Sequence, residues 1–481
     1  MRSRNRYPLV TVRDHGRRDH LESSHAAFIK QLPEFARHLP YQVGTTGIVT
    51  TAGASSFGQA VSLVLLTRQT GSQLPIQIVL DSTAPWIDFL CANEMPRHDA
   101  ACLYINDMWT KLYPFITVKF ERFQWKSIAL VASTFQNVLF LDSDCLPILN
   151  PDRIFEKGAE PFTSAGFITW PDFWASSTSA MFYRVAGDIE VPPLTSRATS
   201  ESGVIVYDKA RHADTLLLAV YYNYNGPGRY YTMLTQHGPG EGDKETFFQA
   251  ALVLDALREK GVYNPPTEWM KPGVGVKKGY WDVKTMPQAH GRTAKGNKWR
   301  GMFMQQMDPM EDYRAVMAAV KEAADNTPSD KATRSKHDDH PPPPRRFWPF
   351  TNLFPKTTPQ KTNPDDPNNP STYLTNSTFL SATGNLTTTP DTARFMFFHH
   401  NGVKPDFTRL RDATAGMQAE GDDGRRLRMW GDPAWIVART GRDVEKLWWE
   451  ASLEVYCQPG VTRWLGAVCE EMRRVWGRVY E

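Results

Sequence analysis

The segment Asn137–Phe155, NVLFLDSDCLPILNPDRIF, places an apolar run directly before a pair of carboxylates. Val138 to Leu141 include no polar residue, which is typical of a strand buried on both faces of a parallel sheet. The run stops at Asp142-Ser143-Asp144, and prolines at 147 and 151 end the strand segment. Because ligands of open α/β sheets bind at the carboxyl ends of such strands, this segment predicts both a fold class and a site.

The two aspartates are candidate ligands for one hard cation. Asp142 and Asp144 are spaced i, i+2 and leave the strand together, so a bend in the backbone can aim both carboxylates at the same ion. Mg²⁺ or Mn²⁺ held by one or two carboxylates, with water and phosphate oxygens around it, is a common use of such a pair. The alternative is an acidic turn after a core strand, and the motif by itself leaves it open.

Length and composition limit the remaining classes of protein. The 481 residues predict more than one structural unit, and a hydrophobic content of 41% is enough for a sizeable core. A net charge of +3 argues against a general nucleic-acid binder, which would show a clustered basic excess. No run of about 18 apolar residues is present, so no transmembrane helix is expected, and the basic N-terminus lacks the apolar stretch of a signal peptide.

The residues before this segment predict a βαβ unit. A strand at 46–53 ends in small residues, a helix follows at 57–70, and a second strand spans 75–81. The turn lacks a full G-x-G-x-x-G, so the end of the first strand, with Thr50, is expected to approach a nucleotide base or ribose; a plain turn is the alternative.

Further elements are expected between this unit and the central strand. Residues 98–112 are predicted to form a helix and 116–118 a short strand. A helix at 121–134 includes Lys126, which either approaches donor phosphates or is an ordinary solvated lysine.

The residues after the central strand include features that suit a sugar. Trp170, Asp172 and Trp174 place aromatic rings beside a carboxylate, although aromatic rings are also the commonest large core residues. Glu201 precedes a strand at 202–208. A tyrosine-rich helix follows at 210–224.

A glycine-rich loop at 238–247 leads into a helix predicted at 244–258. Asp243 is expected to cap that helix, and capping is compatible with presenting a carboxylate to a substrate. Glu241 is a second carboxylate in the same loop.

Residues 325–393 interrupt the pattern. Four consecutive prolines and a Pro/Thr/Asn-rich run cannot bury a core, so this segment is expected to be a disordered insertion. Its sequons at Asn376 and Asn385 are usable only in a secretory lumen. A strand at 394–398 follows, and a helical cap is predicted over 425–480. Cys457 and Cys469 either form a local disulfide or remain two buried thiols.

The strand at 394–398 ends in two histidines, His399 and His400. Imidazole is a good ligand for a transition metal, and only one of two successive rings on an extended backbone can point at the same ion. Lys404 can offset the charge of a diphosphate, and Gly402 would let the backbone approach it. A pair of histidines also occurs in purely structural settings.

Taken in order, these motifs resemble one family. The chain resembles the fungal mannan-branching α-mannosyltransferases, glycosyltransferase family 71, over residues 44–320 and 394–410. The motifs that carry this resemblance are FLDSDCLPILNPDRIF, WPDFW, ESGVIVYDKARH, the tyrosine helix and GEGDKETF. The resemblance implies an α/β, GT-A-like nucleotide-sugar transferase, with a mixed, mostly parallel sheet flanked by helices and a C-terminal helical cap. It implies a polar lead-in at 1–40, a catalytic domain at 41–324 and an active site completed from 394–481.

The resemblance also implies a role for each candidate residue. Metal ligands for Mn²⁺, or Mg²⁺, are expected from Asp142, Asp144 and His399 or His400, with His399 preferred. The donor GDP-mannose would contact Thr50, Lys126, Asp142, Gly402 and Lys404. Asp243 and Glu241 are the candidate catalytic carboxylates, and Trp170, Asp172, Trp174 and Glu201 are the candidate acceptor-binding residues.

The implied activity is retaining transfer of mannose to a mannose-containing glycan, with α-1,2 linkage favoured. The implied location is the Golgi lumen. Membrane association is expected from the family, although this sequence shows no anchor. Two alternatives are an aspartyl-phosphate phosphatase, which normally has threonine where Leu146 stands, and a non-catalytic sugar-binding protein.

Overall fold

The structure is a computed structural model. It describes residues 15–105, 120, 123–193, 198–238, 240–265, 281–282, 285–289, 302–325, 394–400, 404–410, 419–420, 426–430 and 433–480. The proline-rich segment 326–393 and the strand predicted at 116–118 lie outside these residues.

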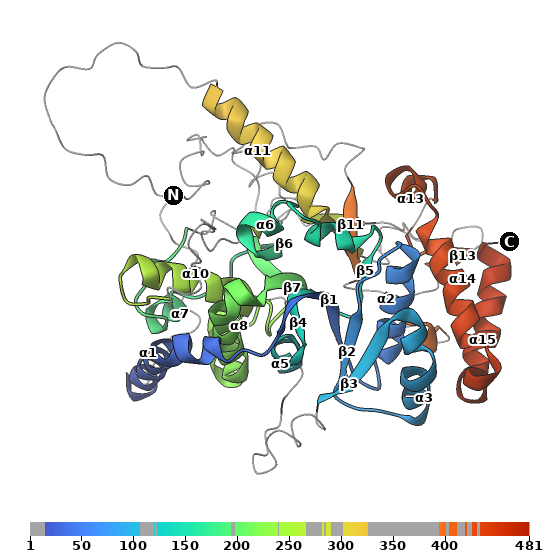
Figure 1. Cartoon of the computed structure of the whole chain (residues 1–481), viewed down its shortest axis with the longest axis horizontal. Helices are drawn as coiled ribbons and strands as arrows, with labels where there is room; N and C mark the ends of the chain where they lie inside the picture. Colours follow the sequence, from blue (N-terminus) through green and yellow to red (C-terminus); the bar gives the residue numbers. More distant parts are fainter. Residues whose placement is uncertain are drawn as a thin grey trace, which may run out of the picture.

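The centre of the fold is a seven-stranded sheet with the order β3-β2-β1-β4-β7-β6-β8 (Figure 1). The first four of these strands are parallel to one another, and β7 runs antiparallel to both β4 and β6. The strands are β1 (Gln42–Ala52), β2 (Ile76–Leu80), β3 (Ala100–Tyr104), β4 (Phe135–Leu141), β6 (Phe167–Ala175), β7 (Ala198–Asp208) and β8 (Trp281–Asp282). The predicted architecture, an α/β fold with a mixed and mostly parallel sheet flanked by helices, is confirmed.

Helices cover both faces of this sheet (Figure 1). Those on one side are α2 (Phe57–Gln69), α3 (Pro85–Asn93), α14 (Val444–Tyr456) and α15 (Pro459–Val479), with α13 (Pro433–Thr440) beside them. Those on the other are α1 (His15–Arg37), α5 (Gln124–Ala132), α7 (Ala180–Val185), α8 (Lys209–Tyr224), α9 (Tyr231–Thr235) and α10 (Thr246–Glu259). The short α6 (Phe162–Ala165) and the long α11 (Pro309–Asp325) lie on the side of the molecule where β6 is found (Figure 1).

The apolar stretch of β4, Val138 to Leu141, is buried on both faces of the sheet. Leu139 and Leu141 pack into the hydrophobic cluster beneath α2 and α14. Val138 and Phe140 pack into the opposite cluster with α5, α8 and α10. Since successive side chains of a strand point to opposite faces, the part of β4 that lies between two helical layers, Val138 to Leu141, needs an apolar residue at each position.

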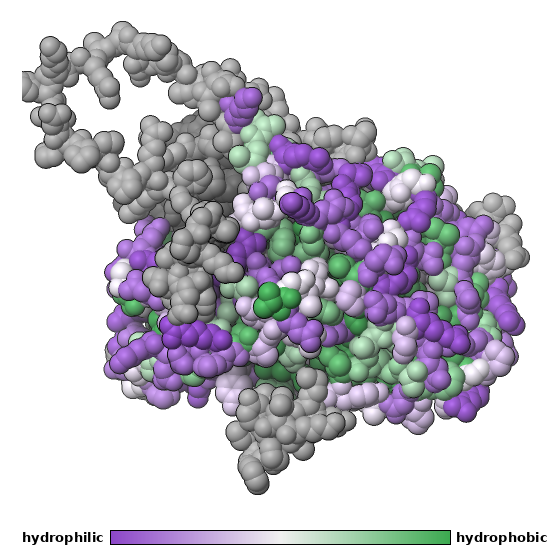
Figure 2. Space-filling view, viewed as in Figure 1, coloured by the Kyte–Doolittle hydropathy of each residue, from purple (hydrophilic) through white to green (hydrophobic). Residues whose placement is uncertain are grey.

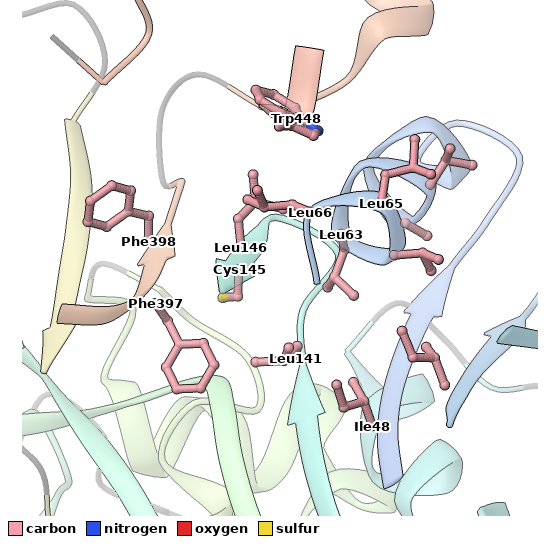
Figure 3. Packing of buried hydrophobic residues seen from close by; sticks show 14 of the residues in the cluster. Ile48, Leu63, Leu65, Leu66, Leu141, Cys145, Leu146, Phe397, Phe398 and Trp448 are labelled. Carbon is pink, nitrogen blue, oxygen red and sulfur yellow. The ribbon is translucent and has the colours of Figure 1, made fainter. Parts of the chain in front are cut away.

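A second sheet lies against the carboxyl end of β4. It has the order β5-β11-β10-β9, formed by β5 (Cys145–Pro147), β11 (Phe395–His399), β10 (Met302–Met307) and β9 (Thr285–Ala289). The aromatic side chains of β11 pack beside Leu146 and below Trp448, as Figure 3 shows. The strand after residue 394 therefore returns to the segment that follows the D-x-D motif.

One predicted element is wrong. Residues 98–112 were expected to be helical, but Ala100–Tyr104 forms β3, the edge strand that pairs with β2. Cys102 on this strand is joined to Cys91 on α3 by a disulfide that the sequence did not suggest. A second disulfide joins Cys457 and Cys469, so the first of the two alternatives for these residues is the one observed.

The surface seen in Figure 2 is mostly hydrophilic, with small groups of hydrophobic residues between the polar ones. This is the usual composition of a surface in contact with water. Within the described part of the chain, no helix combines the length and the hydropathy needed to span a bilayer.

Candidate active site

The D-x-D turn lies at the carboxyl end of β4 and is fixed by backbone hydrogen bonds. The amide of Asp142 donates to the carbonyl of Gly203 on β7 at 2.7 Å, and the amide of Cys145 donates to the carbonyl of Asp142 at 2.8 Å. A pocket of about 270 Å³ opens at this point, at the sheet edge predicted from the sequence. It is lined by Thr51, Ala52, Gly53, Ser56, Val79, Asp81, Trp125, Asp142, Ser143 and Asp144.

Two further polar side chains, one at the end of β11 and one a few residues after it, lie against Asp144. The register of β5 and β11 pairs Cys145 with His399, which places the imidazole Nε2 3.6 Å from the Asp144 carboxylate. Lys404 forms an ion pair and hydrogen bond with the same carboxylate. Burial raises the pKa of Asp144, but His399 and Lys404 outweigh it and hold the pKa below its usual value.

Glu201 supports His399 rather than facing solvent. Its carboxylate lies 3.0 Å from Nδ1 of His399 and also accepts a hydrogen bond from Gln306 at 2.6 Å. Burial lowers the pKa of His399, but the neighbouring carboxylates of Glu201 and Asp144 raise it to about 9. A carboxylate on one ring nitrogen orients the other toward a ligand. The prediction that Glu201 binds the acceptor is therefore corrected: it is buried beneath the candidate metal site.

His400 points away from the two aspartates. Its ring is almost fully buried and accepts a hydrogen bond from the indole N–H of Trp430 at 3.2 Å. Its backbone amide donates to the carbonyl of Asp144 at 3.0 Å. The structure thus separates the two neighbouring histidines as the strand alternation requires, with His399 on the site side. Gly402 lies outside the described residues.

Lys126 joins the metal motif to the glycine-rich loop. Its Nζ is 3.0 Å from Asp142 and 3.0 Å from Asp243, and it donates to the hydroxyl and carbonyl of Ser202, both at 2.8 Å. Burial lowers the pKa of Lys126, but Asp142 and Asp243 outweigh it and raise the pKa above its usual value. The solvated alternative for this lysine is therefore wrong, and its direct partners are protein carboxylates.

The glycine-rich loop that includes Asp243 is anchored to β7 by Glu245. Glu245 is fully buried and accepts hydrogen bonds from the Thr199 hydroxyl and, at 2.7 Å, from the Ser200 amide. The helix α10 begins at Thr246 with Glu245 as its N-cap residue, so the capping role predicted for Asp243 is wrong. Glu241 is exposed and pairs with His237 at 3.1 Å, away from the Lys126 cluster.

The donor side of the pocket differs from the prediction by one residue. Thr50 is fully buried within β1, whereas the next residue, Thr51, lines the pocket. Asp81 at the end of β2 and Trp125 on α5 also line it. These residues were not selected from the sequence, although the predicted end of the second strand included Asp81. Thr50, which was predicted to contact the donor, is therefore not among the residues that line the pocket, and its neighbour Thr51 is.

The aromatic segment on β6 includes a tryptophan that belongs to the core. Trp170 has 0% exposure, donates its indole N–H to the Met307 carbonyl at 3.2 Å and packs edge-to-face on Phe397. The prediction that Trp170 binds an acceptor is corrected, because its ring belongs to the core. Asp172 forms an ion pair with Lys244 at 3.3 Å. Trp174 lies on β6, and its side chain is outside the described part of the structure.

The chemistry of the donor set fits a divalent cation. Ligand atoms of Asp144, Cys145 and His399 lie within 4.8 Å of one another, and Asp142 lines the same pocket as Asp144. The Cys145 thiol is a soft ligand that suits Mn²⁺ and Mg²⁺ poorly, and burial with the nearby carboxylates raises its pKa well above the usual value. Carboxylate oxygens and one imidazole nitrogen remain, and this set suits Mn²⁺ or Mg²⁺.

The separation of the histidines gives a prediction for each ring. His399→Ala should weaken Mn²⁺ binding at least tenfold, because it removes the imidazole beside Asp144. His400→Ala should leave Mn²⁺ binding within about twofold but lower the thermal midpoint, since the buried indole N–H of Trp430 loses its acceptor. Calorimetric titration and thermal melts of both variants measure these effects. Loss of metal binding in His400→Ala alone would show that the other ring is the ligand.

Comparison with known proteins identifies what this part of the chain is similar to. Residues 45–197 and 193–260 match the family described as "Mannosyltransferase putative". The resemblance to the fungal mannosyltransferases is confirmed. The α-1,2-mannosyltransferase MNN23 of Candida albicans is 29% identical over 335 residues, covering 61% of this chain and 51% of that protein. The α-1,2-mannosyltransferase MNN2 of Saccharomyces cerevisiae is 31% identical over 268 residues, covering 47% and 44%.

The extent of these matches is limited to part of each mannosyltransferase. The chain spans about half the length of the curated relatives it matches.

Among solved structures, the glycosyltransferase GlyE of Streptococcus pneumoniae aligns with a TM-score of 0.28 and 13% identity, covering 44% of each chain. The galactosyltransferase LgtC aligns with a TM-score of 0.26 and 10% identity, covering 49% of this chain and 73% of that one. TM-scores this low carry no argument about the site.

Proposed function

We propose that this chain is an α-mannosyltransferase that moves mannose from GDP-mannose to a mannose residue of a mannan or N-glycan outer chain. The α-1,2 linkage, retention of anomeric configuration and dependence on Mn²⁺ are parts of this proposal. The observation that supports it best is the meeting of Asp142, Asp144 and His399 at the end of β4. The D-x-D turn lies in the segment that is similar to α-1,2-mannosyltransferases.

The charges around the pocket suit a nucleotide diphosphate. Asp142, Asp144 and His399 would hold Mn²⁺ or Mg²⁺, which when bound supplies Lewis-acid stabilisation of the charge on a diphosphate leaving group. Lys404 forms an ion pair with Asp144, is more exposed than that carboxylate, and would add a second positive charge beside the cation. Thr51 and Asp81, at the ends of β1 and β2, are placed to contact the nucleoside part.

Asp243 is the carboxylate best placed to act on the transferred sugar. It is buried and connected to Asp142 through Lys126, so it lies close to the metal motif. Transfer from a nucleotide sugar passes through an oxocarbenium-like state, as glycoside hydrolysis does, and a carboxylate stabilises the positive charge that develops. Glu241 is exposed and separate, so Asp243 is the stronger of the two candidates.

The two disulfides support a location in an oxidising compartment. The Golgi lumen is the compartment proposed, because a GDP-mannose-dependent enzyme that modifies outer glycan chains meets its acceptor there. The sequons at Asn376 and Asn385 agree with passage through a secretory lumen. Association with the membrane is part of the proposal.

The test is an activity assay that separates three classes of protein. The chain is incubated with GDP-mannose, Mn²⁺ and an α-mannobiose acceptor, and the release of GDP and the trisaccharide product are followed, with p-nitrophenyl phosphate in a parallel reaction. A trisaccharide cleaved by an α-1,2-specific mannosidase is the expected product. Cleavage of the aryl phosphate alone would indicate a phosphatase, and mannobiose binding without turnover would indicate a sugar-binding protein.

A further inference from the structure

An exposed aromatic ring lies next to the candidate catalytic loop. Phe123, the residue before α5, is 45% exposed and contacts Tyr231 edge-to-face at 6.2 Å between ring centroids. A single exposed aromatic residue is normal on a protein surface. The position of Phe123 suggests a function for it, because the ring contacts the loop that includes Asp243.

The contact between ring and loop depends on Gly242. A Cβ at this position would lie 2.9 Å from carbons of the Phe123 ring, and the glycine has φ +146. Glycine adopts such a conformation at little cost and leaves room for a close approach. The ring therefore rests on the backbone of the residue directly before Asp243.

The start of α5 presents two aromatic residues to different places. Trp125 lines the pocket together with Asp142 and Asp144. Phe123 instead lies against the loop at Gly242. Lys126, on the first turn of the same helix, contacts both Asp142 and Asp243. The start of α5 therefore has the proposed donor pocket on one side. On the other side is the exposed ring of Phe123, which rests on the loop that holds Asp243.

We propose that the exposed face of Phe123 is a stacking surface for the acceptor sugar. The inference rests on the proposed function and names the acceptor subsite within it. A pyranose has one face of C–H groups that packs against an aromatic ring, while its hydroxyls remain available to polar groups. A mannose stacked on Phe123 would lie beside the loop that holds Asp243. Trp170, which the sequence offered for this role, is buried in the core.

The proposal is tested by kinetics that separate acceptor from donor. Phe123→Ala should raise the KM for α-mannobiose on the order of tenfold, which corresponds to the upper range of an aromatic packing contribution. The kcat at saturating acceptor, the affinity for GDP with Mn²⁺ and the hydrolysis of GDP-mannose without acceptor should stay within about twofold. Phe123→Tyr, which keeps the ring face, should behave as the wild type.

The matched control is Phe35 on α1, which is 43% exposed and belongs to a helix on the far side of α8 from β4. Phe35→Ala should leave the acceptor KM unchanged. Phe123→Leu keeps apolar bulk without a flat ring, so a raised KM in this variant supports stacking even if Phe123→Ala folds poorly. An unchanged acceptor KM in Phe123→Ala or Phe123→Leu overturns the proposal.

A direct binding measurement separates failure of this inference from failure of the proposed function. Saturation-transfer NMR with methyl α-mannoside should show equal sugar signals with the wild type and Phe35→Ala, and clearly weaker signals with Phe123→Ala at the same concentrations. If the wild type neither transfers nor hydrolyses GDP-mannose, the proposed function fails, and the NMR result still decides whether Phe123 binds a sugar. Equal signals from the wild type and Phe123→Ala would overturn the subsite.

Discussion

Replacing Asp144 by asparagine is expected to abolish Mn²⁺-dependent binding of GDP and to reduce mannose transfer at least 100-fold. The carboxylate forms an ion pair with Lys404 and lies 3.6 Å from Nε2 of His399, the ring nitrogen that Glu201 does not contact. An amide in its place offers one neutral oxygen to a cation and leaves Lys404 without its counter-charge. Calorimetric titration of Mn²⁺ followed by GDP, together with the transfer assay, measures both losses.

The control for this variant is Asp152→Asn. Asp152 is also hydrogen-bonded, to the Ser72 hydroxyl and the Gln73 amide, but it lies away from the pocket. Asp152→Asn should change the thermal stability of the protein without changing its affinity for Mn²⁺. Near-wild-type titration of Mn²⁺ and GDP by Asp144→Asn would exclude this carboxylate from the metal site and with it the main support for the proposed function.

The second large effect is expected at Asp243. Asp243→Asn should reduce transfer at least 100-fold while GDP and Mn²⁺ still bind within a few-fold of the wild-type affinity. The reason is that its side chain faces Lys126 rather than the candidate ligand His399, so its loss affects the reacting sugar more than the metal. Single-turnover assays beside calorimetry separate the chemical step from binding.

Glu241→Gln provides the comparison within the same loop. Glu241 is exposed and paired with His237, so this variant should transfer mannose at close to the wild-type rate. A large loss of activity in Glu241→Gln with full activity in Asp243→Asn would reverse the assignment of the catalytic carboxylate. Loss of GDP binding in Asp243→Asn would instead show that the loop forms part of the donor site.

The central strand and its acidic end were predictable because local sequence determines them. Burial on both faces requires apolar residues from Val138 to Leu141 in β4, and the change to Asp142 after them is visible without a structure. The edge strand β3 was mistaken for a helix, because a short apolar stretch such as Ala100–Tyr104 does not distinguish the two by periodicity.

The details of the site depend on contacts between distant segments, which the sequence does not specify. The sequence placed Thr50 at the donor, but packing of β1 turns Thr51 toward the pocket, a shift of one residue that changes the face of the strand. The roles of Glu201 and Lys126 were missed for the same reason. Each is defined by an ion pair with a residue far away in the chain, and their own neighbours in sequence give no sign of it.

The pairing of β5 with β11 also has a consequence for how the protein is made. Lys404 and Asp144 are 260 residues apart, and His399 reaches the D-x-D turn by the same pairing. At a synthesis rate of about 5–20 residues per second, the ribosome needs roughly 13–50 s after Asp144 to produce its partners. During that interval the nascent chain has the strand β4 and its two carboxylates but none of the return strand. A chain truncated before residue 395 would therefore include all seven strands of the central sheet and both aspartates of the candidate metal site, but not His399 or Lys404.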